Sequence, residues 1–337
     1  MSHSASPVAL FAMDPVHLGG LFPPAVMARL RQLAEIDPEF VVRDFSDPAA
    51  SVALGRAEVL ITGWGCPHLG GEVLEAAPRL RTVLHAAGSV RQLVGDPFWE
   101  RGLTLSSAVQ ANALPVAEYT LAAILLAGKD AFGLRERLRT ERAHPGPAEY
   151  AKVGNLGRRV GIVGASRVGR RVLELLRPFD FSVSLYDPYV DAAQAADLGA
   201  VSLPLDELLR TSDIVSVHAP DIPQTRHMLS RERLALIPDG GVLINTSRGA
   251  LVDQNALVGE LTGGRLSAVL DVTDPEPLPA DSPLFDLPNV FLTPHIAGSL
   301  GNELARMGTT VVDELERLVA GRPPAHPVHR AALANSA

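Results

Sequence analysis

Three polar residues in the last third of the chain could together act on a small acid. They are Arg248 in "NTSRG", Glu276 in "DPEP" and His295 in "PHIAG". A guanidinium binds a carboxylate through two hydrogen bonds, and an imidazole exchanges a proton near neutral pH. A carboxylate can orient that imidazole and keep it charged, but Asp274 shares the loop with Glu276, so residue type alone leaves two candidates. The set predicts proton transfer on a substrate that carries its own carboxylate.

Each of these residues follows a short run rich in Val, Ile and Leu, which is typical of a strand. The three runs are "GVLINTS" (241–247), "LSAVLDV" (266–272) and "NVFLTP" (289–294). Ligands of an open parallel sheet bind beyond the carboxyl ends of its strands. We therefore expect the three side chains to converge on one crevice.

Similar apolar runs alternate with helical patterns along the whole chain, which indicates α/β units around parallel sheets. Four strands are predicted before residue 108, and six follow from "RVGIVG" (159–164) to "NVFLTP". The helical pattern at about 302–320 is expected to fold back onto the first part. The predicted domains are thus a discontinuous substrate-binding domain, 1–107 with 300–337, and a nucleotide-binding domain, 108–299. The polar start and the Pro/Ala-rich end of the chain are predicted to be loose.

A dinucleotide-binding turn is predicted in "RVGIVGASRVGRRVLELL" (159–176), where a strand runs into Gly164 and a helix opens at about Arg167. Such a turn brings backbone N–H groups close to a pyrophosphate. Ser166 replaces the middle glycine of the usual pattern, and its Cβ would add strain if the position required a positive φ. Asp187 ends the next strand, 18 residues beyond Gly169, where an acid binds the ribose hydroxyls. No Arg follows it to meet a 2'-phosphate, so NAD(H) is predicted over NADP(H).

Composition excludes several other classes of protein. The chain has 337 residues, which is enough for two cores, and its formal net charge of -8 argues against a nucleic-acid surface. The single cysteine, Cys66, cannot form an intrachain disulfide, and residues 1–14 lack the pattern of a signal peptide, so a cytoplasmic location is expected. The apolar stretch 113–128 contains Glu118 and is too short for a membrane span, so we expect no membrane partner. No cluster has the spacing of metal ligands.

The chain resembles the D-isomer-specific 2-hydroxyacid dehydrogenases over nearly its whole length. The resemblance rests on "NALPVAEYTLAAILL", "NLGRRVGIVGASRVGRRV", "VSVHAPDIPQTRHMLS", "LINTSRGALVDQNAL", "AVLDVTDPEPLP" and "LPNVFLTPHIAG". It implies two Rossmann-like or flavodoxin-like parallel-sheet domains with a cleft between them, and a homodimer. It also implies that Arg248 holds the substrate, that His295 is the acid/base and that Glu276, rather than Asp274, is its partner. The implied cofactor contacts are Gly164, Ser166, Arg167, Val168, Gly169, Asp187, His218, Thr225, Thr246 and Asp271, the last meeting the nicotinamide carboxamide.

The chain departs from the family pattern at two places, Ser166 and the segment "HAAGSVRQL" (85–93). In that segment Ser89 and Arg91 replace a small residue and an acid, while Gly88 and Ser89 are still expected to meet the substrate's carboxylate. The predicted function is NAD(H)-dependent reduction of a small 2-keto acid. The alternative is an NAD(H)-sensing protein without turnover, because members of the family also serve as corepressors. The resemblance does not choose among the 2-keto acids.

Overall fold

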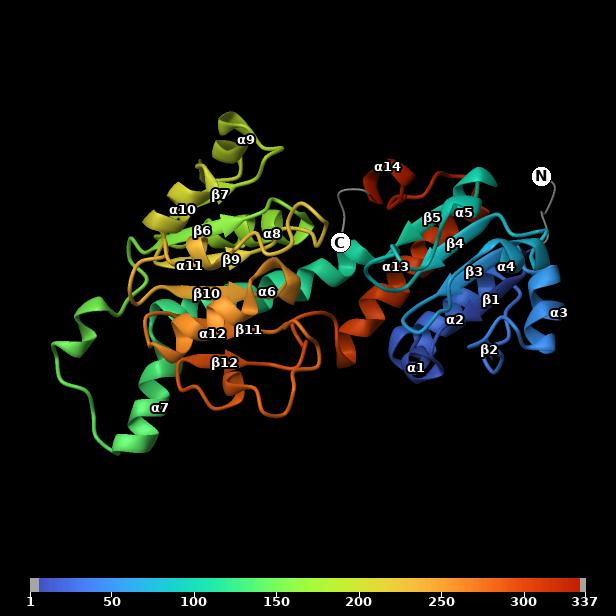
Figure 1. Cartoon of the computed structure of the whole chain (residues 1–337). Helices are drawn as coiled ribbons and strands as arrows, with labels where there is room; N and C mark the ends of the chain where they lie inside the picture. Colours follow the sequence, from blue (N-terminus) through green and yellow to red (C-terminus); the bar gives the residue numbers. More distant parts are fainter. Residues whose placement is uncertain (1–5, 334–337) are drawn as a thin grey trace. The chain divides into compact units, whose positions relative to one another are not determined.

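In the computed structural model, which describes residues 6–333, the chain forms two compact units. Of the described residues, the first contains 6–112 and 299–333, and the second contains 113–298. Each unit is built on one parallel sheet flanked by helices (Figure 1). The α/β class with two parallel-sheet domains is therefore confirmed.

The first unit has a five-stranded sheet in the order β2-β1-β3-β4-β5, which is a flavodoxin-like order. Its strands are β1 (Ala9–Ala12), β2 (Val41–Val42), β3 (Val59–Thr62), β4 (Thr82–His85) and β5 (Thr104–Ser107). Its helices are α1 (Leu18–Leu21), α2 (Pro24–Leu33), α3 (Pro48–Arg56), α4 (Gly71–Ala76), α5 (Asp96–Glu100), α13 (Leu304–Val319) and α14 (Arg330–Leu333). Successive strand residues point to opposite faces, so α2 and α13 cover one apolar face while α3 and α4 cover the other.

The second unit has a seven-stranded sheet in the order β12-β11-β10-β9-β6-β7-β8, and the strand order reverses at β6. Its strands are β6 (Arg159–Val163), β7 (Ser182–Tyr186), β8 (Val201–Ser202), β9 (Ile214–Val217), β10 (Val242–Asn245), β11 (Ser267–Leu270) and β12 (Val290–Leu292). Its helices are α7 (Ala131–Glu141), α8 (Arg167–Leu176), α9 (Ala192–Asp197), α10 (Leu205–Thr211), α11 (Arg231–Leu234), α12 (Gln254–Thr262) and most of α6 (Val109–Gly128). Side chains of α6 and α8 pack on one face of the sheet, and those of α10 and α12 pack on the other.

Helix α6 is long and apolar enough to cross a membrane by length and composition alone. In this structure its Ala117, Ala123, Ile124 and Ala127 are buried in the core of the second unit. The apolar character of α6 is therefore used in packing against the sheet.

Three expectations need correction. The first sheet has five strands rather than four and the second has seven rather than six, because β5 and the two-residue β8 were missed. The C-terminal segment is not loose over its described part. Glu314 is buried in α13 and accepts hydrogen bonds from the backbone N–H groups of Ala325 and His326, at 3.0 and 2.8 Å. Residues 1–5 and 334–337, to which the same expectation applied, lie outside the described residues.

The two units divide after Asn112 and after Gly298, compared with predicted divisions after 107 and after 299. Ala108 and Ala111 are buried in the core of the first unit, which carries that unit into the first turn of α6. The side-chain oxygen of Asn112 also accepts a hydrogen bond of 2.9 Å from Ser299 N, which joins the two segments of the unit.

Candidate active site

The ends of β10, β11 and β12 lie side by side at the carboxyl edge of the second sheet. Asn245 pairs with Leu270, and Leu270 pairs with Leu292, so the three strands stop at the same level. The loops that follow carry Arg248, Asp271 and His295. The structure therefore places the three loops of the predicted site next to one another.

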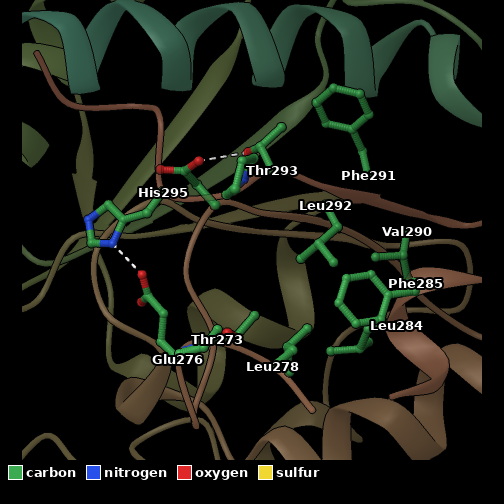
Figure 2. A pocket seen from close by; sticks show the side chains of 13 residues that line it. Thr273, Glu276, Leu278, Leu284, Phe285, Val290, Phe291, Leu292, Thr293 and His295 are labelled. Carbon is green, nitrogen blue, oxygen red and sulfur yellow. Dashed lines mark hydrogen bonds and ion pairs between the residues drawn. The ribbon is translucent and has the colours of Figure 1, made fainter. Parts of the chain in front are cut away.

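His295 and Glu276 form the central pair of the site. Nδ1 of His295 lies 2.6 Å from Oε1 of Glu276, and the two side chains are 47% and 41% exposed. Figure 2 shows the other ring nitrogen, Nε2, pointing away from Glu276. Asp274 is not the partner, and its backbone N–H instead donates to the side chain of Gln254 at 2.8 Å. The structure thus selects Glu276 and leaves Nε2 able to exchange a proton.

Asp271, which follows β11, holds the loop on which His295 lies. The residue is only 2% exposed, and its carboxylate accepts hydrogen bonds from the backbone N–H groups of Ile296 at 2.8 Å and Ala297 at 2.9 Å. The predicted contact of Asp271 with a nicotinamide stays a prediction. The observed role of the buried carboxylate is to fix the backbone immediately after the histidine.

Arg248 lies on the adjoining loop, which Asn245 fixes. The buried side chain of Asn245 donates to the Arg248 carbonyl at 2.8 Å and accepts from Ser247 N at 3.1 Å. Gly249 is required here, because a Cβ at this position would lie 2.1 Å from the carbonyl oxygen of Thr273. The loop of Arg248 therefore packs directly on the start of the loop that carries Glu276.

The Arg248 side chain is half-buried, and its Nη1 donates to the Ser247 carbonyl at 2.6 Å. Within residues 6–333, no hydrogen bond or ion pair is found between this guanidinium and Glu276 or His295. Its remaining N–H groups can bind an added carboxylate.

An apolar cavity of about 800 Å³ adjoins the Glu276–His295 pair. Its wall is formed by Leu278, Leu284 and Phe285 together with the side chains of β12 (Figure 2). The free ring nitrogen of His295 points away from these apolar side chains. Glu276 and His295 themselves form part of the lining of this cavity.

The glycine-containing turn after β6 has the geometry of a close-approach site. Gly164 has a φ of +101°, and a Cβ there would lie 2.6 Å from Ala219 N. A Cβ at Gly169 would lie 2.1 Å from the Gly164 carbonyl oxygen. Ser166 has a φ of -61°, so the strain considered for this residue does not arise, and its Oγ caps α8 by accepting from Gly169 N at 3.3 Å. Arg167 is exposed and Val168 half-buried in the first turn of α8.

Asp187 ends β7 beside this turn. Its carboxylate accepts from Ala165 N at 2.7 Å and from Tyr189 N at 2.8 Å. The acid is therefore held against the turn after β6, as a ribose-binding acid requires.

The remaining predicted cofactor residues make internal contacts. His218 is buried behind Gly169, its Nε2 lies 2.8 Å from Ser216 Oγ, and burial lowers its pKa to about 3. Its Nδ1 has no hydrogen-bond partner among the residues the structure describes. Thr225 accepts from Ile222 N within its own turn, at 3.1 Å. The buried hydroxyl of Thr246 lies 2.9 Å from that of Thr120 in α6.

Gly88 and Ser89 belong to the first unit, in the loop after β4. The hydroxyl of Ser107, at the end of β5, donates to the Gly88 carbonyl at 2.8 Å and so fixes this loop to the neighbouring strand. Arg91 donates from Nη2 to the carbonyl of Leu333 in α14, at 3.0 Å. The predicted substrate contacts of Gly88 and Ser89 stay predictions.

Sequence reasoning missed Asn245 and Thr293, although both lie at the ends of predicted strands. Thr293 donates to Asp271 Oδ1 at 2.7 Å. The available signal was a polar side chain ending an apolar run, in "VLIN" and "VFLT".

A model of the D-isomer specific 2-hydroxyacid dehydrogenase NAD binding domain matches residues 121–297. The D-3-phosphoglycerate dehydrogenase of Mycobacterium bovis is 38% identical over 251 residues, which are 74% of this chain and 47% of that protein. The glyoxylate reductase of Korarchaeum cryptofilum is 30% identical, with 89% of this chain and 93% of that protein covered. The chain spans about half the length of the phosphoglycerate dehydrogenases it matches.

A solved structure of similar fold is the D-isomer specific 2-hydroxyacid dehydrogenase of Xanthobacter autotrophicus in complex with NADPH and MES. Its sequence is 25% identical to this chain, and the TM-score is 0.76. The superposition covers 98% of this chain and 100% of that chain.

A parallel sheet with a glycine turn at its order reversal and an acidic residue beside that turn defines a dinucleotide-binding α/β protein. The family match over residues 121–297 and the similarity to the glyoxylate reductase over most of both chains narrow this class to one family. The chain belongs to the D-isomer specific 2-hydroxyacid dehydrogenase family.

Proposed function

We propose that the protein is an NAD(H)-dependent oxidoreductase that reduces the C2 carbonyl of a small 2-keto acid to the D-2-hydroxy acid. One observation carries the proposal. His295 presents a free Nε2 at the carboxyl edge of the sheet while Glu276 holds its Nδ1 at 2.6 Å. An imidazole held in this way is a general acid or base, and Arg248 on the adjoining loop adds a binding group for the substrate's carboxylate.

The turn after β6 fits a dinucleotide. Gly164 and Gly169 leave no room for a Cβ, so the turn packs closely against the segment after β9 and against the start of α8. The ten-residue helix α8 begins beside the turn, and the N-terminus of a helix favours the negative charge of a pyrophosphate. The unpartnered Nδ1 of His218 supports a ligand on this side of the strand ends. The carboxylate of Asp187 suits ribose hydroxyls and disfavours a 2'-phosphate by like-charge repulsion, which supports NAD(H) over NADP(H).

A bound NADH would supply the hydride. The residues of the chain do the remaining work in the proposed mechanism. Arg248 binds the substrate's carboxylate, and protonated His295 delivers its Nε2 proton to the oxygen on which negative charge develops. Glu276 accepts the Nδ1–H of the same ring, which fixes the ring's orientation and stabilises its charge. In the reverse direction, neutral His295 removes the hydroxyl proton.

The test is NADH oxidation, followed at 340 nm, against a panel of 2-keto acids. We expect turnover on at least one acid, a loss on the order of 10²-fold or more in His295→Ala, and a clear loss in Glu276→Gln. His144→Ala, a change at an exposed histidine in the 142–148 segment, is the matched control and should keep the wild-type rate. NADPH in place of NADH should give a lower kcat/KM.

Two outcomes would contradict the proposal. If His295→Ala kept the wild-type rate, the acid/base assignment would be wrong. If NADH bound tightly but no acid consumed it, the protein would be a cofactor sensor instead.

A further inference from the structure

We propose that Tyr119 and Thr293 are positioning residues for His295. Through a chain of hydroxyl groups they orient the Asp271 carboxylate, which in turn holds the backbone turn that keeps the imidazole at Glu276. The inference rests on the proposed role of His295 as the acid/base, and it adds two residues to which neither the family match nor the sequence assigns a function.

The backbone at His295 needs support. Its φ is +55°, in the left-handed region that residues with a Cβ rarely adopt. Such conformations persist where surrounding contacts fix them, and they cluster at functional sites. A relaxation of this turn to an ordinary conformation would move the ring away from Glu276.

Most of the hydrogen bonds that support this turn come from Asp271, and His295 N also lies 3.1 Å from the Thr293 carbonyl oxygen. Three successive N–H groups converge on this one residue. His295 N donates to the Asp271 carbonyl at 2.9 Å, Ile296 N to Oδ1 at 2.8 Å, and Ala297 N to Oδ2 at 2.9 Å. Convergent backbone N–H groups form a concave site for an anion, and here the anion is an internal carboxylate. The direction of that carboxylate therefore sets the turn.

The hydroxyl groups set the direction of the carboxylate. Thr293 Oγ1 lies 2.7 Å from Asp271 Oδ1 and 2.7 Å from Tyr119 Oη. A hydroxyl has one proton to donate, and an ionised carboxylate only accepts, so Thr293 donates to Asp271. Tyr119 must then donate to Thr293. The result is a directed chain of two bonds, Tyr119 to Thr293 to Asp271; Figure 2 shows the second of them, from Thr293.

Tyr119 is suited to this donor role. Burial raises the pKa of its phenol above the ordinary value, with the nearby Asp271 charge adding to the shift, so the hydroxyl keeps its proton across the working range. The next residue on α6, Thr120, meets Thr246 at the end of β10 at 2.9 Å. One turn of α6 thus fastens the loops that follow two different strands.

The test compares Thr293→Val, which is nearly isosteric but cannot donate, with Thr293→Ser, which keeps the hydroxyl. Tyr119→Phe removes only the outer donor, and Tyr150→Phe is its matched control, because Tyr150 is 42% exposed. Five quantities are measured on the full chain: kcat and KM for the keto acid, NADH affinity, the melting temperature, and the ring ¹⁵N signals of His295 without ligands. The last signals are assigned by their absence in His295→Ala.

We expect Thr293→Val to lower kcat by at least about tenfold, because a small misplacement of a reacting group costs that much or more. NADH affinity should fall by less than kcat, because the glycine-containing turn after β6 lies at other strands and only the predicted contact of Asp271 with the nicotinamide would be affected. The ring ¹⁵N signals should broaden or split in Thr293→Val, while Thr293→Ser restores one sharp signal for each ring nitrogen and most of kcat. Tyr119→Phe should show the same changes in weaker form, and Tyr150→Phe none.

The inference is overturned if a folded Thr293→Val keeps both the wild-type kcat and one sharp ¹⁵N signal for each ring nitrogen of His295. It is also overturned if Thr293→Ser is as impaired as Thr293→Val, since the hydroxyl would then not be the cause. Failure of the proposed function looks different. In that case His295→Ala keeps the wild-type rate or the wild type has no turnover, and the ¹⁵N comparison still decides the positioning role.

Discussion

Two histidines outside the proposed proton-transfer step show how burial sets charge at single residues. His85, at the end of β4, lies 2.8 Å from Thr62 Oγ1 and has its pKa lowered to about 4, chiefly by burial. Burial likewise lowers the pKa of His218 to about 3. At the pH at which these histidines begin to bind a proton in the unfolded chain, both rings are therefore still neutral in the folded protein.

This difference predicts a loss of stability in acid. Below the ordinary histidine pKa of 6.5, His85 and His218 bind protons in the unfolded state but not in the folded state. The free energy of unfolding then falls with pH, from about 6.5 down to about 4 for His85 and to about 3 for His218. Urea unfolding at a series of pH values should show a slope reduced by up to about one proton in His85→Gln or His218→Gln. A slope unchanged in both variants would contradict the assignment.

At this scale the sequence identified the reactive groups better than the groups that hold them. Arg248, Glu276 and His295 could be found because each is a charged or titratable side chain after an apolar run. Asn245 and Thr293 could not, because their roles depend on which strands are neighbours and on the direction of hydrogen bonds. The amino-acid sequence of one protein specifies neither the strand neighbours nor the directions of the hydrogen bonds.

At the scale of elements, the period of apolar residues predicted ten of the twelve strands found in residues 6–333 and failed where polar residues are buried. In β5, Ser106 and Ser107 are 2% and 3% exposed, and their hydroxyls donate to backbone carbonyls of other segments. Burying a hydroxyl that has a hydrogen-bond partner costs little free energy, so these serines can lie in a buried strand that lacks the expected apolar pattern. The other missed strand, β8, has only two residues.

Helix α8 provides a prediction at the same scale, because Ser166 begins it where the family usually has glycine. Its Oγ accepts from Gly169 N, so Ser166→Ala should lower stability by about 1 kcal/mol, whereas Ser166→Gly should cost only a few tenths. Chemical unfolding of the two variants checks the order. A Ser166→Gly protein less stable than Ser166→Ala would show that the hydroxyl does not act as a cap.

At the scale of the whole molecule, the first unit depends on both ends of the described chain. Helix α13 follows the second unit in sequence, yet its Met307, Val311, Val312 and Leu315 are buried in the core formed with β1 and β3. Arg29 of α2 also pairs with Asp313 at 2.6 Å. A helical pattern could be predicted there from the sequence, but its partner surface required the fold.

Gly308 is a point of close approach between α13 and the N-terminal segment, because a Cβ there would lie 1.7 Å from the Leu21 carbonyl oxygen. Gly308→Ala should therefore force α13 away from α1 and destabilise the first unit, while the second unit keeps its sheet and its affinity for NADH. Hydrogen exchange followed by peptide should rise in β1, β3 and α13 but stay unchanged in β6 and α8. Gly55→Ala in α3 is the matched control, because its nearest neighbour, Ala76 O, lies 4.0 Å away. Faster exchange in both units alike would mean that they unfold as one body and that α13 does not act on the first unit alone.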